Sequence, residues 1–164
     1  MGHIGSYLWK IRQHLGSQLV LLPGAQVLVL GQVGHALFQR RADNGMWELP
    51  AGSCEPGQSF RTAAVAELFE ETGIVAKAED LEPFASLSDP SIHTLTYPNG
   101  DQVQAFAMCF VLASWEGSLS AEECEVSDLG FFPLVDPPSP THAPTLEVLK
   151  LYALFQETGV FQAK

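Results

Sequence analysis

Three glutamates crowd the end of the segment GSCEPGQSFRTAAVAELFEETGI, residues 52–74. On a helix, Glu67, Glu70 and Glu71 are spaced so that their side chains share one face. No Lys or Arg lies within four residues of any of them. Oxygen ligands of this kind suit a hard divalent cation, Mg²⁺ or Mn²⁺, which also binds substrate phosphates. The cluster therefore indicates a metal site, and a solvated acidic face is its structural alternative.

The element that must position these carboxylates is a helix over about 59–72, which Gly73 ends as its C′ residue. Apolar side chains occupy most of the remaining helix surface: Phe60, Ala63, Ala64, Val65, Ala66, Leu68 and Phe69. This pattern predicts a helix that is buried on most sides and carries one acidic stripe.

Strands and two further helices surround this helix in the predicted order helix, strands, helix, strands, helix. The runs 25–31 and 35–41 are predicted to form a hairpin, and Asn99-Gly100 favours a second hairpin between 92–97 and 102–115. A strand is predicted at 129–134, and helices are predicted at 6–14 and 144–159. Mixed pairing with helices on both faces predicts one α/β or α+β layered domain over residues 1–164.

Composition limits the partners. The net charge of −11 would repel the backbone of a nucleic-acid duplex, so a small anionic substrate must be reached through a cation. Three cysteines without a CxxC or CxxH spacing indicate neither a disulfide framework nor a zinc site. The apolar run 18–31 is too short to span a bilayer. No membrane partner and a cytoplasmic location are expected, and monomer and homodimer both stay open.

The segment 52–74 resembles the box of the Nudix (MutT-like) hydrolase family, G-x5-E-x7-R-E-U-x-E-E-x-G-U, in which U is aliphatic. The matches are Gly52 at the first position, Glu67-Leu68, Glu70-Glu71 and the ending Gly73-Ile74. Two positions depart from the box: Gln58 replaces its first Glu, and Ala66 replaces its Arg. In the family that Arg commonly supports the adjacent Glu. With Ala66 at this position, the resemblance no longer specifies the orientation and pKa of Glu67.

The resemblance implies a three-layer α/β/α sandwich with a mixed sheet. It also implies Mg²⁺- or Mn²⁺-dependent hydrolysis of the pyrophosphate linkage in a nucleoside diphosphate joined to another moiety. The substrate could be ADP-ribose-like or a nucleoside triphosphate. By the same resemblance Glu67, Glu70 and Glu71 are the metal ligands, with the Ala51 carbonyl as an addition. A further acid outside the box often acts as ligand or general base. Glu125 is expected in that role, with Glu122 and Glu123 as alternatives.

Four residues are candidates for binding substrate. Arg40 and Arg41 end a predicted strand, where a guanidinium could grip phosphate or form an ordinary surface ion pair. Trp47 and Tyr97 could stack on a base, although aromatic residues beside apolar strands more often belong to the core. A different functional class is a catalytically weakened Nudix-fold module that binds or senses a nucleotide. Gln58 and Ala66 motivate this alternative.

Overall fold

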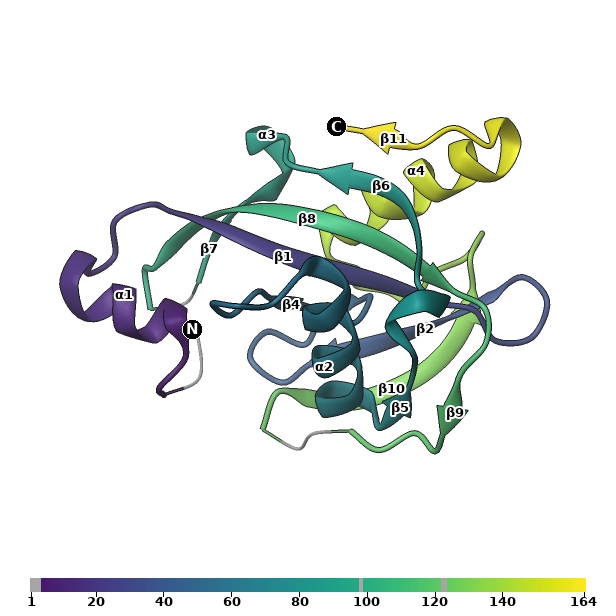
Figure 1. Ribbon diagram of the computed structural model, residues 1–164, viewed down its shortest axis with the longest axis horizontal. Coiled ribbons are helices and arrows are strands. Elements are labelled where there is room, and N and C mark those ends of the chain that lie inside the picture. Colours follow the sequence, from purple (N-terminus) through teal and green to yellow (C-terminus); the bar gives the residue numbers. More distant parts are fainter. Residues whose placement is uncertain (1–3, 98, 122–123) are drawn as a thin grey trace.

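A long mixed sheet forms the centre of the computed structural model, which describes residues 4–97, 99–121 and 124–164 (Figure 1). The strand order is β11-β6-β8-β1-β4, and β7 also pairs with β8. Strand β1 runs parallel to β8 and antiparallel to β4. The bounds are β1 Val20–Val29, β4 Ala51–Ser53, β6 Glu82–Leu87, β7 Thr94–Thr96, β8 Gln102–Leu112 and β11 Gln162–Ala163.

Two smaller sheets complete the strand layer, β10-β2-β3 and β5-β9. Their strands are β2 His35–Arg41, β3 Trp47–Glu48, β5 Ile74–Val75, β9 Glu116–Gly117 and β10 Val126–Pro133. The predicted hairpin between 25–31 and 35–41 is wrong. Strands β1 and β2 touch through one bridge, Leu30 to Ala36, and then pair with different partners. The second predicted hairpin is confirmed, since β7 pairs antiparallel with β8 across the turn that contains Gly100.

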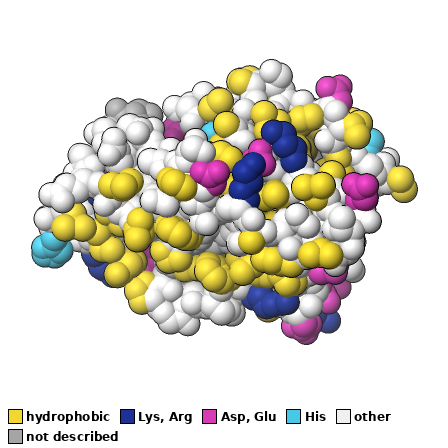
Figure 2. Space-filling model, turned by 90° about the horizontal axis from the view of Figure 1, so that it is seen from above, with side chains coloured by type: hydrophobic (Ala, Val, Ile, Leu, Met, Phe, Trp, Pro, Cys, Tyr) yellow, Lys and Arg dark blue, Asp and Glu magenta, His cyan; other side chains and the backbone are white. Residues whose placement is uncertain are grey.

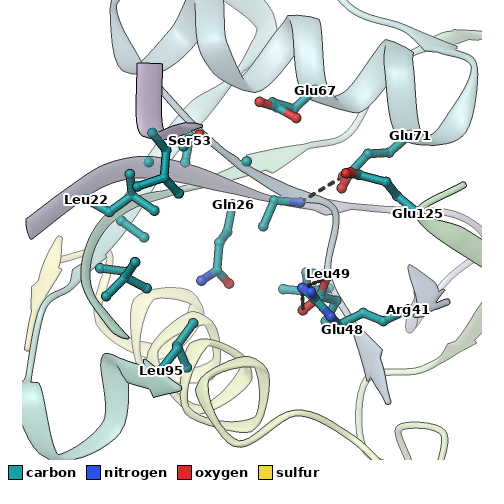
Figure 3. A pocket seen from close by; sticks show the side chains of 18 of the residues that line it. Leu22, Gln26, Arg41, Glu48, Leu49, Ser53, Glu67, Glu71, Leu95 and Glu125 are labelled. Atoms are coloured by element: carbon teal, nitrogen blue, oxygen red, sulfur yellow. Dashed lines mark hydrogen bonds and ion pairs between the residues drawn. The ribbon is translucent and has the colours of Figure 1, made fainter. Parts of the chain in front are cut away.

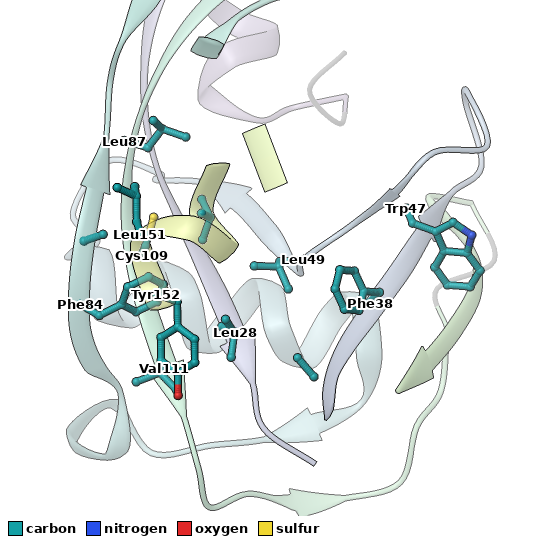
Figure 4. Close-up of a cluster of buried hydrophobic side chains, with 13 residues drawn as sticks. Leu28, Phe38, Trp47, Leu49, Phe84, Leu87, Cys109, Val111, Leu151 and Tyr152 are labelled. Carbon is teal, nitrogen blue, oxygen red and sulfur yellow. The ribbon is translucent and has the colours of Figure 1, made fainter. Parts of the chain in front are cut away.

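The helices are α1 Tyr7–Leu15, α2 Phe60–Thr72, α3 Pro90–His93 and α4 Ala143–Thr158, with the 3-10 turn η1 Ala78–Asp80. The short helix α3 replaces the start of the predicted strand 92–97, because Pro90 follows the capping residue Asp89. In the main sheet, Val27 and Val29 pack with α2, whereas Leu28 packs with α4. Successive strand residues point to opposite faces. Helices α2 and α4 therefore cover opposite faces, and the predicted α/β/α sandwich is confirmed (Figures 1 and 4).

Helix α2 begins and ends close to the predicted residues. Ser59 and Thr62 cap its first turn reciprocally, each hydroxyl accepting from the other residue's backbone N–H. Gly73 ends it at φ 74, a conformation that favours glycine. The prediction of a helix buried on most sides is wrong, because Phe60 and Phe69 are 37% and 57% exposed. The sheet covers only the side of the helix that carries Ala63, Ala64 and Leu68.

Arg61 anchors α2 to the chain that follows it. Its guanidinium donates to the carbonyls of Ala78 and Leu81 and lies 5.4 Å from the ring centre of Phe110. The helix is thereby tied to both η1 and the sheet.

No helix in the three described stretches of the chain is long and apolar enough to span a membrane. Figure 2 views the face that carries β11 and α4 and shows a band of hydrophobic side chains with a few scattered Lys, Arg, Asp and Glu. Among the described residues, this face presents no continuous basic surface.

Candidate active site

A cavity of about 850 Å³ opens between α2, the main sheet and the β2–β3 strands. Figure 3 shows Glu67, Glu71 and Glu125 turned into it from one side, with Glu48 and Arg41 facing them from another. Seven of its described lining residues are acidic: Asp43, Glu48, Glu55, Glu67, Glu70, Glu71 and Glu125. The only Lys or Arg among those lining residues is Arg41. The cavity therefore has a large excess of negative charge.

Glu71 is the most buried of the three helix glutamates, at 6% exposure. Its Oε2 accepts a hydrogen bond of 3.1 Å from the backbone N–H of Ala51. Burial raises the pKa of Glu71 well above its usual value, and the charges of Glu48 and Glu67 add to this. Hydrogen bonds from Gln39 and Ala51 oppose the shift without cancelling it. The carboxyl is therefore poorly satisfied as an anion unless a cation joins it.

The absence of a side chain at Gly52 makes room for Glu67. A Cβ built on Gly52 would lie 2.0 Å from Glu67 Cδ and 2.4 Å from its Oε1. A methyl group there would overlap the carboxylate, so Glu67 could not keep its position against strand β4. Gly52 therefore determines where the Glu67 carboxylate of helix α2 lies.

Glu70 is exposed, whereas Glu67 is half-buried, and both line the cavity together with Glu71. Among the described residues, no three His, Cys, Asp or Glu side chains already converge as a metal site. In the described part of the chain the carboxylates therefore share a cavity without forming a ready-made set of three metal ligands. Glu125 lies in the same cavity, whereas Glu122 and Glu123 fall outside the described residues.

The predicted substrate residues divide into two groups. Arg41 and Tyr97 line the cavity. Arg40 does not, because its Nε donates to the carbonyl of Gly45 at 3.0 Å within the turn that follows β2. Trp47 is also outside the cavity lining. It is 8% exposed and packs edge-to-face on Phe132 with ring centres 5.0 Å apart. Trp47 is therefore a core residue and is not placed to stack on a base in this cavity.

Arg41 is already paired. Its Nε and Nη2 donate to Asp43 at 2.8 Å each, and its Nη1 donates to Glu48 at 3.1 Å. These two carboxylates hold its pKa above the usual value. A phosphate would have to compete with both of them, so Arg41 is less available than its position in the sequence indicated.

Several cavity residues were not identified from the sequence: Gln26, Gln39, Glu48, His93 and His142. Gln26 and Gln39 interrupt apolar strands, and a buried polar residue inside a strand is a usable signal. Glu48 stands between Trp47 and Leu49, where it gave the same signal. His93 ends α3 and His142 directly precedes α4, and only the folded chain brings these two residues to the cavity.

The sequence profile of the NUDIX domain matches residues 20–152. An RNA pyrophosphohydrolase of Roseobacter denitrificans is 30% identical over 131 residues, which cover 73% of this chain and 81% of that protein. The chain belongs to the Nudix hydrolase family. A putative 8-oxo-dGTP diphosphatase of Bacillus subtilis is 46% identical over 50 residues, 30% of this chain and 34% of that protein. A MutT NUDIX hydrolase from Burkholderia pseudomallei has the same fold, with a TM-score of 0.67 at 21% identity, covering 80% of this chain and 98% of that chain.

The two departures from the Nudix box have different surroundings. Gln58 lies outside the cavity lining, and its Oε1 accepts from the backbone N–H of Glu55 at 2.8 Å. A glutamate at this position could accept the same bond, so the change preserves the local structure. Ala66 and Gly73 also lie outside the cavity lining. Ala66 supplies no polar group to Glu67, which has other interactions in the structure.

Replacing Gly52 by Ala is expected to lower turnover by roughly 10- to 100-fold, because the new methyl group displaces the Glu67 carboxylate. The Tm should change little, since the end of a flexible side chain can move away. Thermal unfolding and initial rates of the two proteins measure both effects. Unchanged turnover would mean that the position of Glu67 does not matter for the reaction.

Replacing Glu125 by Gln is expected to lower turnover by roughly 100-fold, the usual contribution of a general base. Glu79→Gln is the matched control, because Glu79 is an exposed acid of η1 that does not line the cavity. That variant should keep wild-type turnover. Equal losses in the two variants would remove Glu125 from the reaction.

Proposed function

We propose that this Nudix hydrolase, a single domain over residues 1–164, cleaves the pyrophosphate linkage of a nucleoside diphosphate joined to another moiety, using Mg²⁺ or Mn²⁺. The observation that carries the proposal is the cavity in which, among the described residues, seven carboxylates face one arginine. A pyrophosphate cannot enter such a site without cations, since like charges in a partly desolvated cavity repel strongly. Phosphoryl transfer depends mainly on positioning and charge neutralisation.

Glu67, Glu70 and Glu71 are the proposed ligands, with the Ala51 carbonyl beside them. Their oxygens fit a hard divalent cation, and Gly52 leaves the space that Glu67 needs. The raised pKa of Glu71 fits the same role, because a buried carboxyl needs a positive partner to ionise. When bound, the metal would neutralise charge on the phosphates and activate a water molecule.

The other roles fall to residues around these ligands. Glu125 is proposed to accept the proton of the attacking water, as it lies in the same cavity as the ligands. Tyr97, which is half-buried there, offers a ring face to the substrate. Arg41 is proposed to hold Glu48 in place through their ion pair. A phosphate is proposed to contact Arg41 only where its ion pairs with Asp43 and Glu48 leave the guanidinium accessible.

The substrate class is proposed as nucleotides of small size, ADP-ribose-like or nucleoside triphosphate. Two relatives are named as an RNA pyrophosphohydrolase and a putative 8-oxo-dGTP diphosphatase. Both names indicate substrates with a pyrophosphate bond next to a nucleoside. A substrate panel tests the proposal. ADP-ribose, nucleoside diphosphate sugars, dinucleoside polyphosphates, nucleoside triphosphates and a 5′-triphosphorylated oligonucleotide are each assayed with Mg²⁺ and with Mn²⁺. Absence of hydrolysis across the whole panel would reject it.

The competing proposal is a catalytically weakened module that binds a nucleotide without turning it over. Ala66 favours it, because no arginine stands beside Glu67 in the helix. The retention of Glu67, Glu70 and Glu71 in one cavity with Glu125 favours the enzyme. Tight nucleotide binding measured by calorimetry, without product in the same samples, would support the module instead.

A further inference from the structure

The wall of the cavity away from Glu67, Glu70 and Glu71 carries hydrogen-bonding groups. The protein fixes the directions of these groups. Gln26, on the central strand β1, is 7% exposed and lines this wall. Figure 3 shows its side chain extending into the cavity. Apolar side chains line the same cavity, including Leu22 and Leu95. The wall therefore combines surfaces for a flat ring with a few oriented polar atoms.

A chain of two hydrogen bonds fixes the amide of Gln26. His93 is 4% exposed, and its Nδ1 lies 3.2 Å from the carbonyl oxygen of Leu87. A carbonyl only accepts, so Nδ1 carries the proton. Burial lowers the pKa of His93, which keeps the ring neutral and leaves Nε2 as an acceptor. Nε2 lies 3.5 Å from Nε2 of Gln26, which must donate to it.

Gln26 Oε1 is consequently left as a hydrogen-bond acceptor. It has no hydrogen-bond partner among the described residues, and it is not one of their buried unpartnered atoms. It therefore remains open to the cavity. The Leu87 carbonyl fixes the His93 tautomer, and His93 in turn fixes the orientation of the Gln26 amide. The direction of Oε1 is therefore set before a ligand binds.

His142 supplies a second acceptor by the same logic. Its Nδ1 lies 3.5 Å from Glu48 Oε2, so the proton of the neutral ring belongs on Nδ1 and Nε2 accepts. Burial, and the charge of Arg41 after it, lowers the pKa of His142 to about 4, so the ring is neutral at pH 7. Glu48 itself is turned toward Arg41, Gln39 and His142 and holds this arrangement.

Donors on the same wall are scarce. Each nitrogen of the Arg41 guanidinium faces a carboxylate of Asp43 or Glu48. The hydroxyls of Tyr97 and Thr145 can either donate or accept. A ligand that presents only acceptors would leave Gln26 Oε1 and His142 Nε2 unpaired next to its own lone pairs, which is costly away from water.

We propose that Gln26 and His142 form an acceptor-lined specificity site for a nucleobase that presents an exocyclic amino group, whose two N–H donors suit two acceptors, and that His93 and Glu48 position them. The inference rests on the proposed function, because it assigns the base-selecting part of the same cavity. Nucleotides of adenine and cytosine fit this site, whereas hypoxanthine and uracil present a carbonyl oxygen at the corresponding ring position.

Matched nucleotide pairs test the assignment. ATP and ITP differ by an amino or oxo group at one purine position, and CTP and UTP differ likewise in the pyrimidine. We expect kcat/KM to favour the amino member of each pair by about tenfold or more. Because both members are measured on one enzyme sample, the ratio is independent of the fraction of folded protein.

Gln26→Met keeps the length of the side chain and removes the acceptor, so it should bring both ratios close to one. His93→Phe removes the group that orients Gln26 and should lower the ratios as well. The matched control is Gln104→Met on the neighbouring strand β8, because Gln104 is half-buried but does not line the cavity. That variant should keep the wild-type ratios. Equal use of both members by the wild type, or ratios that survive in Gln26→Met, would overturn the assignment.

The failure of this inference can be distinguished from failure of the proposed function. If no pyrophosphate is cleaved, titration calorimetry with AMP and IMP still measures the base preference in the same cavity. Tighter AMP binding that depends on Gln26 would support the specificity site without an enzyme. Equal affinities for AMP and IMP would overturn it, whatever the outcome of the activity panel.

Discussion

Replacing Glu71 by Gln is expected to stabilise the metal-free protein and to lower turnover by roughly 100-fold or more. The stabilisation follows from burial, because an ionised Glu71 is desolvated and faces the charges of Glu48 and Glu67. A neutral amide avoids both costs and can still accept from the N–H of Ala51. The loss of turnover follows from the proposed loss of a metal ligand. Thermal unfolding in chelator and initial rates in Mg²⁺ measure the two effects.

The stabilisation has a defined pH dependence. The pKa of Glu71 is raised by folding, so its contribution to stability is fully present below the usual value of 4.5. That contribution is lost as the pH rises toward the folded pKa. Metal-free wild type should therefore lose stability above about pH 4.5 relative to Glu71→Gln, and the difference in Tm should grow with pH. A difference that shrinks with pH would contradict the assigned shift.

Glu70→Gln separates stability from activity. Glu70 is proposed as a ligand like Glu71, but its side chain is exposed and its charge is solvated. Turnover should again fall by roughly 100-fold or more, whereas the Tm of the metal-free protein should barely move. Metal-induced stabilisation should shrink in both variants, because a ligand stabilises in proportion to its affinity for the folded state. Intact metal-induced stabilisation in both would make these carboxylates structural.

Removal of divalent cations should lower turnover by roughly 1000-fold or more. Seven carboxylates and one arginine line the cavity in the described part of the chain, so a pyrophosphate would otherwise meet mainly negative charge. The measurement is the initial rate in excess chelator, followed by titration with Mg²⁺ or Mn²⁺. Readdition should restore the rate, which excludes unfolding as the cause. Undiminished turnover in chelator would reject the metal mechanism.

The sequence alone determined the helix that carries the acids and the family to which it belongs. Ser59 and Gly73 mark the two ends of α2 through local backbone chemistry, so neighbouring residues were sufficient to place them. The spacing of Glu67, Glu70 and Glu71 assigned them to one helix, and all three line one cavity. Such local signals survive in any fold that keeps the helix.

Only the tertiary structure decided how each acid differs from its neighbours. Glu70 is exposed and Glu71 is buried, although they are adjacent in the chain, because the sheet covers one side of α2. Phe60 and Phe69 are exposed for the same reason, and hydrophobicity alone predicted the opposite. Burial depends on what lies across from a residue, and that partner is distant in sequence.

Strand pairing over long sequence distances was the other feature outside the reach of the sequence, although the local β7–β8 hairpin was predicted correctly. Strands β1 and β2 are consecutive, yet β1 pairs with β8, about 80 residues further along the chain, by parallel pairing that requires a long crossover connection. The same long-range packing brings His93 and His142 next to the cavity of Gln26. Local patterns define which segments are extended, but the choice among competing partners is made by the buried surface that each pairing creates. The acidic helix could therefore be read from its residues, whereas the opposite wall of the cavity required the assembled sheet.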